Sequence, residues 1–457
     1  MKKFLKVFFI LVLSLYCYTN VSAENFTIHS EHAILYNLKD NTIIYEKAAE
    51  EKTKVASLTK IMTAIVAIEN IENLNKKVVL NSNVFAGLRE ANAAVAGFKV
   101  GDNVSYLDLL MGTMLPSGAD AARGLAINIA GSEKEFVVLM NKKAKELNLT
   151  NTNFVNITGL DADNHYSTVK DISIILKYAL NNPTFKQIYT TREYTTTKGL
   201  KLYSTLRELK KQFPADTSNI LGTKTGYTKE AGLCLSSIAN YIGVDYLLVT
   251  TGADSNSNSP LQLLDTLTIY NYYSNNYSYQ DIITLNQEII NIPIKYNKKK
   301  YTVNSPTTIS KYLPNTFNKE KITYKYIGVD YLSHKNKYLE EIGKIQIIYE
   351  NEILDTIPIY LNKEIKLDVI TYLIQTKIIY VIIFILIITI YFIYKYKKAK
   401  KRRFFSQWDS FYFFFLYLNK ADGLCPSPPF TLFVFSTLSA IILLNAGSNS
   451  FLPKITS

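Results

Sequence analysis

The chain has 457 residues, of which 48% are hydrophobic, and its formal net charge is +13. Ten positive charges lie in two short stretches, three within the first six residues and seven between 395 and 403, which leaves about +3 for the rest. The body of the protein is therefore nearly balanced in charge, which argues against nucleic-acid binding. A chain of this length has room for two or three domains with their own cores.

Residues 1–23 have the pattern of a secretory signal peptide. A basic start is followed by an apolar run from Phe4 to about Tyr16 and by small residues just before Glu24. The run is short for a membrane-spanning helix, although an uncleaved anchor is the alternative. In either case the body of the protein is exported. Residues 33–46 then predict a strand, a turn and a second strand.

The stretch 55–64 places a serine and a lysine three residues apart at the start of a predicted helix. Apolar residues continue at helical spacing through Ile68, which indicates a largely buried helix. Positions three apart share a helix face, so Lys60 can reach the hydroxyl of Ser57. A serine becomes a good nucleophile when a base takes its proton, and a lysine is such a base only while neutral. The alternative is chance, since the same spacing recurs at Ser167 and Lys170.

Two later stretches carry further polar candidates. A helix is predicted around 107–114, and after a Pro-Ser-Gly turn an alanine-rich helix resumes toward Ala130. Ser117 lies on that turn, where it either meets a substrate or caps the helix. Residues 152–172 are polar and rich in turns. There we expect a structural, hydrogen-bonding role for His165 and no nucleophilic role for Ser167, because no buried helical run accompanies it.

Residues 221–239 are consistent with a turn feeding a strand, followed by another strand, and 246–251 predict one more. Lys224, Thr225 and Gly226 place a cation, a hydroxyl and a residue without a side chain in a row. Such a row can hold a carboxylate while the glycine lets a ligand approach the backbone. The alternative is an ordinary surface turn.

The C-terminal part changes in texture. Strand-like runs between about 280 and 366 predict a separate small all-β domain with no chemical motif. Residues 378–394 are uncharged and just long enough to span a bilayer, and the basic run that follows places 395 onward in the cytoplasm. The tail at 404–457 is either a marginal second span or sequence without a selected fold.

Metal and disulfide signals are weak. The three cysteines, Cys17, Cys234 and Cys425, form no Cys-x-x-Cys pair, and no intramolecular disulfide is expected. His29 and His32 are three residues apart but precede a strand-like run, which does not imply helical ligand spacing. We predict neither a metal site nor a cofactor.

The three motifs stand in one order along the chain: Ser57-Leu-Thr-Lys60, Ser117-Gly-Ala119 and Lys224-Thr-Gly226. In that order, and with its flanking stretches over about residues 25–275, the chain resembles the serine penicillin-binding proteins, and more narrowly the low-molecular-weight D-alanyl-D-alanine carboxypeptidases. The resemblance implies an α+β fold with a β-lactamase/transpeptidase-like domain, an antiparallel sheet flanked by helices. On this basis the predicted domains are a peptidase domain at 24–275, a β domain at 276–366, a transmembrane helix at 378–394 and a cytoplasmic segment at 395–457.

The resemblance also implies roles for individual residues. Ser57 attacks the carbonyl between two D-alanines, Lys60 takes the serine proton, and Ser117 relays a proton toward the leaving amine. Lys224 supplies positive field, Thr225 binds the terminal carboxylate beside Gly226, and the backbone amides of Ser57 and Tyr227 stabilise the oxyanion. The implied activity removes the terminal D-alanine from peptidoglycan stem pentapeptides at the cell membrane, with β-lactams as inhibitors.

One position departs from the family pattern. The second motif is usually Ser-x-Asn, whereas this chain has Ala119, and the missing amide normally contacts the substrate. Losing one positioning hydrogen bond costs on the order of 1–3 kcal/mol. Asp120 is a poor substitute, since a carboxylate only accepts hydrogen bonds. The alternatives to an active carboxypeptidase are a catalytically weak penicillin-binding protein with a binding or scaffolding role and, on weaker grounds, a β-lactamase.

Overall fold

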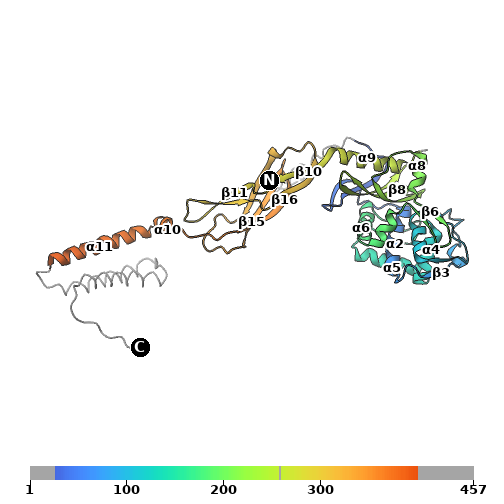
Figure 1. Ribbon diagram of the computed structural model, residues 1–457, viewed down its shortest axis with the longest axis horizontal. Helices are drawn as coiled ribbons and strands as arrows, with labels where there is room; N and C mark the ends of the chain where they lie inside the picture. The colour runs from blue at the N-terminus through green and yellow to red at the C-terminus, as the bar shows by residue number, and fades with distance from the viewer. Residues whose placement is uncertain (1–25, 257–258, 400–457) are drawn as a thin grey trace, which may run out of the picture. The chain divides into compact units, whose positions relative to one another are not determined.

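The computed structural model describes residues 26–256 and 259–399, so the predicted signal peptide and the tail at 404–457 lie outside the described residues. The chain divides into two compact units (Figure 1). The first runs to Ile282 and also includes Ile309–Asn318, while the second comprises Ile283–Thr308 and the chain from Lys319. Strands β10 (Tyr277–Ile283) and β13 (Ile309–Pro314) pair with each other, largely within the first unit. Both strands lie within the predicted β domain at 276–366, and the division of the chain into a peptidase domain and a β domain stays a prediction.

A five-stranded antiparallel sheet forms the centre of the first unit. Its strands lie in the order β2-β1-β9-β8-β7. The first hairpin of the chain therefore joins the sheet through the pairing of β1 with β9. The predicted hairpin at 33–46 and the predicted strand at 246–251 are confirmed. The strands are β1 (His32–Asn37), β2 (Thr42–Lys47), β7 (Ile220–Thr228), β8 (Gly232–Tyr241) and β9 (Val244–Ala253).

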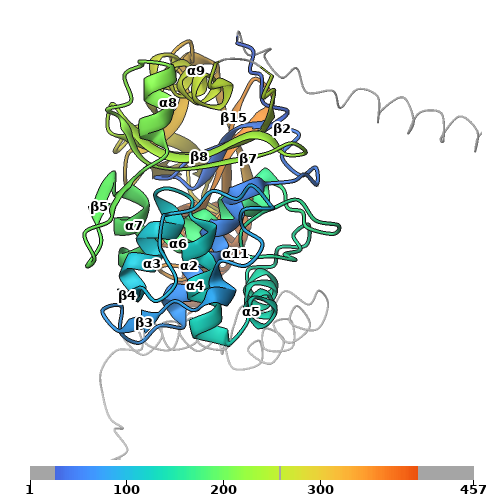
Figure 2. The same cartoon turned by 90° about the vertical axis from the view of Figure 1, so that its right-hand side faces the viewer.

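Both faces of the sheet are buried, as the side chains of β1 show. Successive side chains of a strand point to opposite faces. Ile34 and Tyr36 belong to one hydrophobic core, whereas Ala33 and Leu35 belong to the other. Figure 2 shows α8 (Leu206–Gln212) and α9 (Leu261–Asn276) on one side of the sheet and the helices from α2 (Thr59–Glu69) to α6 (Val169–Leu180) on the other. A sheet covered on both sides has a rigid interior on which neighbouring loops can be held.

Three helices of the first unit, α2, α3 and α4, match positions predicted from the sequence. The predicted helix at 107–114 is α3, and the alanine-rich helix is α4, which ends as predicted at Ala130. The helices are α2 (Thr59–Glu69), α3 (Tyr106–Met114), α4 (Ala119–Ala130), α5 (Glu133–Glu146), α6 (Val169–Leu180), α7 (Pro183–Thr190), α8 (Leu206–Gln212) and α9 (Leu261–Asn276). Short elements between them are the 3-10 turns η1 (Ala56–Leu58) and η2 (Ser82–Val84) and the paired strands β3 (Lys77–Val79) with β4 (Asn103–Ser105) and β5 (Glu193–Thr195) with β6 (Lys201–Tyr203).

The second unit is built mainly of strands, as its texture predicts. A three-stranded antiparallel sheet and a two-stranded one bury a small core of aliphatic and tyrosine side chains. The elements are β11 (Glu288–Pro293), β12 (Lys300–Asn304), η3 (Lys319–Lys321), β14 (Ile322–Gly328), β15 (Glu341–Tyr349), β16 (Glu352–Tyr360), α10 (Val369–Gln375) and α11 (Ile378–Ala399). Within the described part of the chain, one helix is long and apolar enough to cross a membrane, over Ile378–Lys398.

Candidate active site

Ser57 and Lys60 meet where η1 passes into α2. The serine lies on the 3-10 turn just before the α-helix, half-buried, and Lys60 lies in the first turn of α2 with only 2% of its surface exposed. The Nζ of Lys60 donates to the Oγ of Ser57 over 2.9 Å. The reach predicted from the three-residue spacing is therefore confirmed, and the hydroxyl and the amine lie as a nucleophile and its base would have to lie.

A backbone carbonyl from the 155–160 loop completes the surroundings of the amine. The oxygen of Thr158 accepts a hydrogen bond from Lys60 over 2.8 Å. The carboxamide oxygen of Asn156 shapes this loop by accepting from the N–H groups of Thr158 and Gly159. Gly159 has φ +82°, and a Cβ there would lie 1.8 Å from the carbonyl oxygen of Ala56. Only glycine allows the loop to approach η1 so closely.

Ser117 and Lys224 form a second hydroxyl–amine pair. Ser117 lies between α3 and α4 with φ +64°, a left-handed conformation that is costly for serine. Its Oγ accepts from the Nζ of Lys224 over 2.7 Å, and the same amine donates to the carbonyl of Thr225 over 2.8 Å. Lys224 is fully buried in the middle of β7, so this motif is part of the sheet and is not an ordinary surface turn.

Strand β7 also lies directly against η1. A Cβ on Gly226 would lie 3.0 Å from the backbone nitrogen of Ser57, which is tighter than most such contacts. The glycine therefore permits the strand to pass beside the nucleophile. Tyr227, the residue after this glycine, is exposed. The hydroxyl of Thr225, the residue before it, donates to the hydroxyl of Thr205 over 2.8 Å.

Burial sets the protonation of both amines. Burial lowers the pKa of Lys60 from 10.5 to about 7, against an opposing attraction from the carboxylate of Asp120. Burial also lowers the pKa of Lys224 well below its ordinary value, and the positive charge of Lys60 adds to that effect. A buried cation is expensive, so burial shifts each amine toward its neutral form. A neutral amine hydrogen-bonded to a serine can accept its proton.

Comparison with known proteins identifies the family. The family model described as D-alanyl-D-alanine carboxypeptidase matches residues 19–255, about half of the chain. D-alanyl-D-alanine carboxypeptidase DacF of Bacillus subtilis is 30% identical over 350 residues, which cover 74% of this chain and 86% of that protein. The chain belongs to the D-alanyl-D-alanine carboxypeptidase family. It is thus a serine hydrolase of the penicillin-binding type, as its motifs predict.

Two further similarities add detail. The D-alanyl-D-alanine endopeptidase of Escherichia coli is 32% identical over 209 residues, 46% of this chain and 66% of that protein. The solved structure of the D-alanyl-D-alanine carboxypeptidase DacD from Francisella tularensis has a TM-score of 0.61 at 21% identity and covers 77% of this chain and 97% of that one. The latter confirms the predicted α+β fold class. Proteins named for two different cleavage preferences thus resemble this member of the carboxypeptidase family.

Asp120 has a role that its sequence position did not reveal. Its buried carboxylate accepts hydrogen bonds from the backbone N–H groups of Ala96, Gly97 and Phe98, over 2.7 to 3.1 Å. It also accepts from the N–H group of the next residue on α4. The N–H of Ala119 in turn donates to the carbonyl of Ala94. Asp120 therefore fixes segment 94–98 against the second motif of this carboxypeptidase-family chain.

The second Ser-x-x-Lys pair does not assemble. The hydroxyls of Ser167 and Thr152 form a hydrogen bond of 2.8 Å, and Lys170 forms an ion pair with Glu50. His165, as expected, makes structural contacts. Its Nδ1 accepts from the backbone N–H of Val155 over 3.1 Å, so the proton is on Nε2, which donates to the Thr59 hydroxyl over 3.0 Å. Burial lowers the pKa of His165 to about 4, which favours this neutral form.

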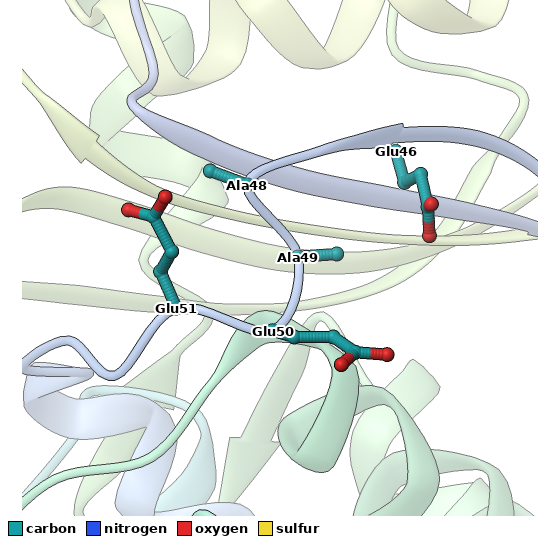
Figure 3. Close-up of a pocket in the computed structure, with 5 residues that line it drawn as sticks. All are labelled: Glu46, Ala48, Ala49, Glu50 and Glu51. Carbon is teal, nitrogen blue, oxygen red and sulfur yellow. The ribbon is translucent and has the colours of Figure 1, made fainter. Parts of the chain in front are cut away.

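A shallow pocket lies away from the motifs. It is lined by Glu46, Ala48, Ala49, Glu50 and Glu51 where the chain leaves β2 (Figure 3), and its volume is about 400 Å³. None of the motif residues lines it, so it has no part in the candidate active site. Within the described residues, no group of three or more His, Cys, Asp or Glu is arranged to hold a metal ion.

Sequence reasoning missed three contributors to this carboxypeptidase-family site: Thr158, Asp120 and Thr205. Thr158 contributes through its backbone carbonyl, which no side-chain pattern can reveal. Asp120 was considered only as a substitute for the missing amide. Thr205 comes from a stretch with no recognised motif. For Thr158 alone the sequence offers a signal, because Gly159 follows it and a glycine can mark a close backbone approach.

Proposed function

We propose that this protein is a serine-type D-alanyl-D-alanine carboxypeptidase that removes the terminal D-alanine from peptidoglycan stem pentapeptides through an acyl-enzyme on Ser57. The proposal rests above all on one observation, the 2.9 Å hydrogen bond between the Lys60 amine and the Ser57 hydroxyl. Because burial lowers the pKa of Lys60 to about 7, much of this amine is neutral near neutral pH and able to act as a general base.

Acylation begins when Lys60 accepts the Ser57 proton and the serine Oγ bonds to the carbonyl carbon between the two D-alanines. Negative charge moves to the carbonyl oxygen, where the backbone N–H groups of Ser57 and Tyr227 donate hydrogen bonds. The proximity of Gly226 to the Ser57 nitrogen supports this pairing of N–H groups.

Collapse of this intermediate breaks the peptide bond. The proton that Lys60 took from Ser57 passes to the leaving amine through the hydroxyl of Ser117, which is held by Lys224 over 2.7 Å, and Lys60 becomes neutral again. Thr225 binds the carboxylate of the departing D-alanine. Water then attacks the acyl-enzyme while Lys60 accepts a proton from it. As the ester bond breaks, Lys60 returns this proton to the Ser57 oxygen, and the shortened peptide leaves.

β-Lactam antibiotics are the expected inhibitors. The same serine attacks their strained amide. Because the broken bond belongs to a ring, no leaving group departs, and the ring-opened acyl group stays bound to Ser57. Rapid turnover of penicillin in place of a persistent adduct would instead indicate a β-lactamase.

Ala119 favours a second candidate function, a catalytically weak penicillin-binding protein with a binding or scaffolding role in the cell wall. Its side chain is a buried methyl group and offers no amide to a substrate. Both oxygens of the neighbouring Asp120 already accept backbone hydrogen bonds, so this residue does not take over the role.

Release of D-alanine from a stem pentapeptide separates the two functions. We expect release by the full-length protein and its loss in Ser57→Ala. Lys170→Arg, in the serine–lysine pair that does not assemble, is the matched control and should keep the activity. Equal rates for the wild type and Ser57→Ala would refute the enzymatic proposal, and penicillin labelling without D-alanine release would favour the weak binding protein.

We further propose a location at the cell membrane, with the peptidase domain at 24–275 and the β domain at 276–366 on the extracytoplasmic side. The apolar helix α11 supports a membrane anchor, and the lysines at its end support a cytoplasmic C-terminus by the positive-inside rule. Protease protection of a C-terminal tag in intact spheroplasts tests this orientation.

A further inference from the structure

Thr205 joins two motif segments although it belongs to no motif itself. It is the residue just before α8, and its backbone N–H donates to the carbonyl of Leu115, two residues before Ser117, over 3.1 Å. Its hydroxyl accepts from the hydroxyl of Thr225 over 2.8 Å. The second and third motifs are thus connected through this one threonine.

The side chain of Thr205 is not used to cap its helix. A threonine just before a helix commonly accepts a hydrogen bond from a backbone N–H of the first turn. No such bond forms at α8. The hydroxyl is turned to Thr225 instead, which is half-buried on β7 beside the glycine that contacts the Ser57 backbone.

Two adjacent hydroxyls carry two protons, and their mutual hydrogen bond uses one of them. Among the described residues, neither hydroxyl makes another side-chain hydrogen bond. Because Thr225 is the donor within the pair, the O–H of Thr205 is able to donate to an anion. A carboxylate, which only accepts hydrogen bonds, is a suitable partner. A hydrogen bond to a charged group is also stronger than one between neutral groups.

We propose that Thr205 is a specificity-determining residue, and that its hydroxyl together with that of Thr225 recognises the free C-terminal carboxylate of the substrate. This inference rests on the proposed carboxypeptidase function and assigns its preference for a chain end to a residue outside the three motifs. A substrate whose carboxylate is blocked gains nothing from the pair.

The test compares two substrates in three proteins. The substrates are an acyl-D-Ala-D-Ala peptide and the same peptide with a C-terminal amide, and the proteins are the wild type, Thr205→Val and Thr205→Ser, each full-length. Thr205→Val should lower kcat/KM for the free acid roughly tenfold and leave that for the amide within about twofold. Thr205→Ser keeps the hydroxyl and should keep the wild-type ratio.

A merely structural role gives a different result. If Thr205 only holds α8 in place, Thr205→Val lowers both rates equally, and that outcome overturns the inference. So does an unchanged ratio in Thr205→Val. Thermal unfolding of each variant shows whether its fold is intact.

A second comparison keeps the inference testable if peptide turnover is weak. The rate of Ser57 acylation by benzylpenicillin and by its methyl ester gives the same ratio of free to blocked carboxylate. Absence of D-alanine release from the wild type would count against the proposed function. By contrast, wild-type discrimination between acid and ester in Thr205→Val would count against the assignment of Thr205.

Discussion

Acylation of Ser57 should fall steeply as the pH drops below about 7, because the proposed base, Lys60, is a buried lysine. Lys60 is 2% exposed, and burial lowers the pKa of its amine from 10.5 to about 7. At pH 7 about half of such an amine is neutral, whereas a lysine with the ordinary pKa would be neutral in only about 0.03% of molecules. The protein thus increases the available base by roughly three orders of magnitude.

The sign of the effect follows from the direction of the shift. Below the folded pKa the amine is protonated and cannot take the serine proton, so the rate should fall about tenfold per pH unit. Between about pH 7 and 10.5 the unfolded chain holds a proton that the folded one has released, so this group makes folding more favourable as the pH rises. Below pH 7 the buried amine costs about 5 kcal/mol of stability, which is the energetic counterpart of its activation.

The assay is the second-order rate of labelling by a fluorescent penicillin between pH 5.5 and 9, with the melting temperature recorded at each pH. A plateau above pH 8 and a decline below pH 7 are expected. Lys60→Arg, which stays protonated, should label negligibly at every pH, while Lys170→Arg should follow the wild type. A rate that stays constant from pH 8 to 5.5 would refute the assignment of Lys60 as the base.

Three further outcomes follow from the structure. Gly159→Ala should prevent acylation and lower the melting temperature, since its Cβ would lie 1.8 Å from a backbone oxygen. Gly199 has a similar φ of +80° but open space around it, so Gly199→Ala should lower the free energy of unfolding by only about 1–2 kcal/mol. Equal effects of the two substitutions would contradict this reasoning. Asp120→Asn should move the acid limb of acylation to lower pH, because the carboxylate favours the protonated amine of Lys60; a shift to higher pH in the labelling profile would contradict it. Burial lowers the pKa of His165 from 6.5 to about 4, so the unfolded chain binds the extra proton and wild-type stability should fall as the pH drops from 6.5 to 4, by about 3 kcal/mol. His165→Gln should flatten this dependence in denaturant unfolding, and an unchanged slope would rule out His165 as its source.

Much of the fold could be predicted from local patterns. Residues 33–46 predict a hairpin because two strand-like runs are separated by a turn at Lys39-Asp40-Asn41. The two sides of β1 are buried by different cores. The contact between Ser57 and Lys60 follows from helical spacing alone. The limits of the first unit were harder to predict, because β10 and β13 look like any other strands until their pairing is known.

The candidate site was predictable only where its chemistry resides in side chains with a fixed spacing. The Thr158 carbonyl that binds Lys60 comes from a loop about a hundred residues away, and every residue has such a carbonyl. Thr205 and Asp120 lie in stretches whose roles depend on what the fold brings beside them. A pattern search finds the groups that react, but not the groups that hold them.

Ala119 shows how this distinction bears on activity. The family's usual asparagine would give the substrate an amide at this position, and both oxygens of Asp120 are committed to fixing segment 94–98. In the proposed function, substrate orientation then depends on the groups that remain, the Ser117 hydroxyl held by Lys224 and the hydroxyl pair of Thr225 and Thr205. Fewer positioning contacts make each of them count for more. Loss of the Thr205 hydroxyl should accordingly change the choice of substrate before it changes the reactivity of Ser57, because the proposed base, Lys60, lies on α2 and Thr205 lies just before α8.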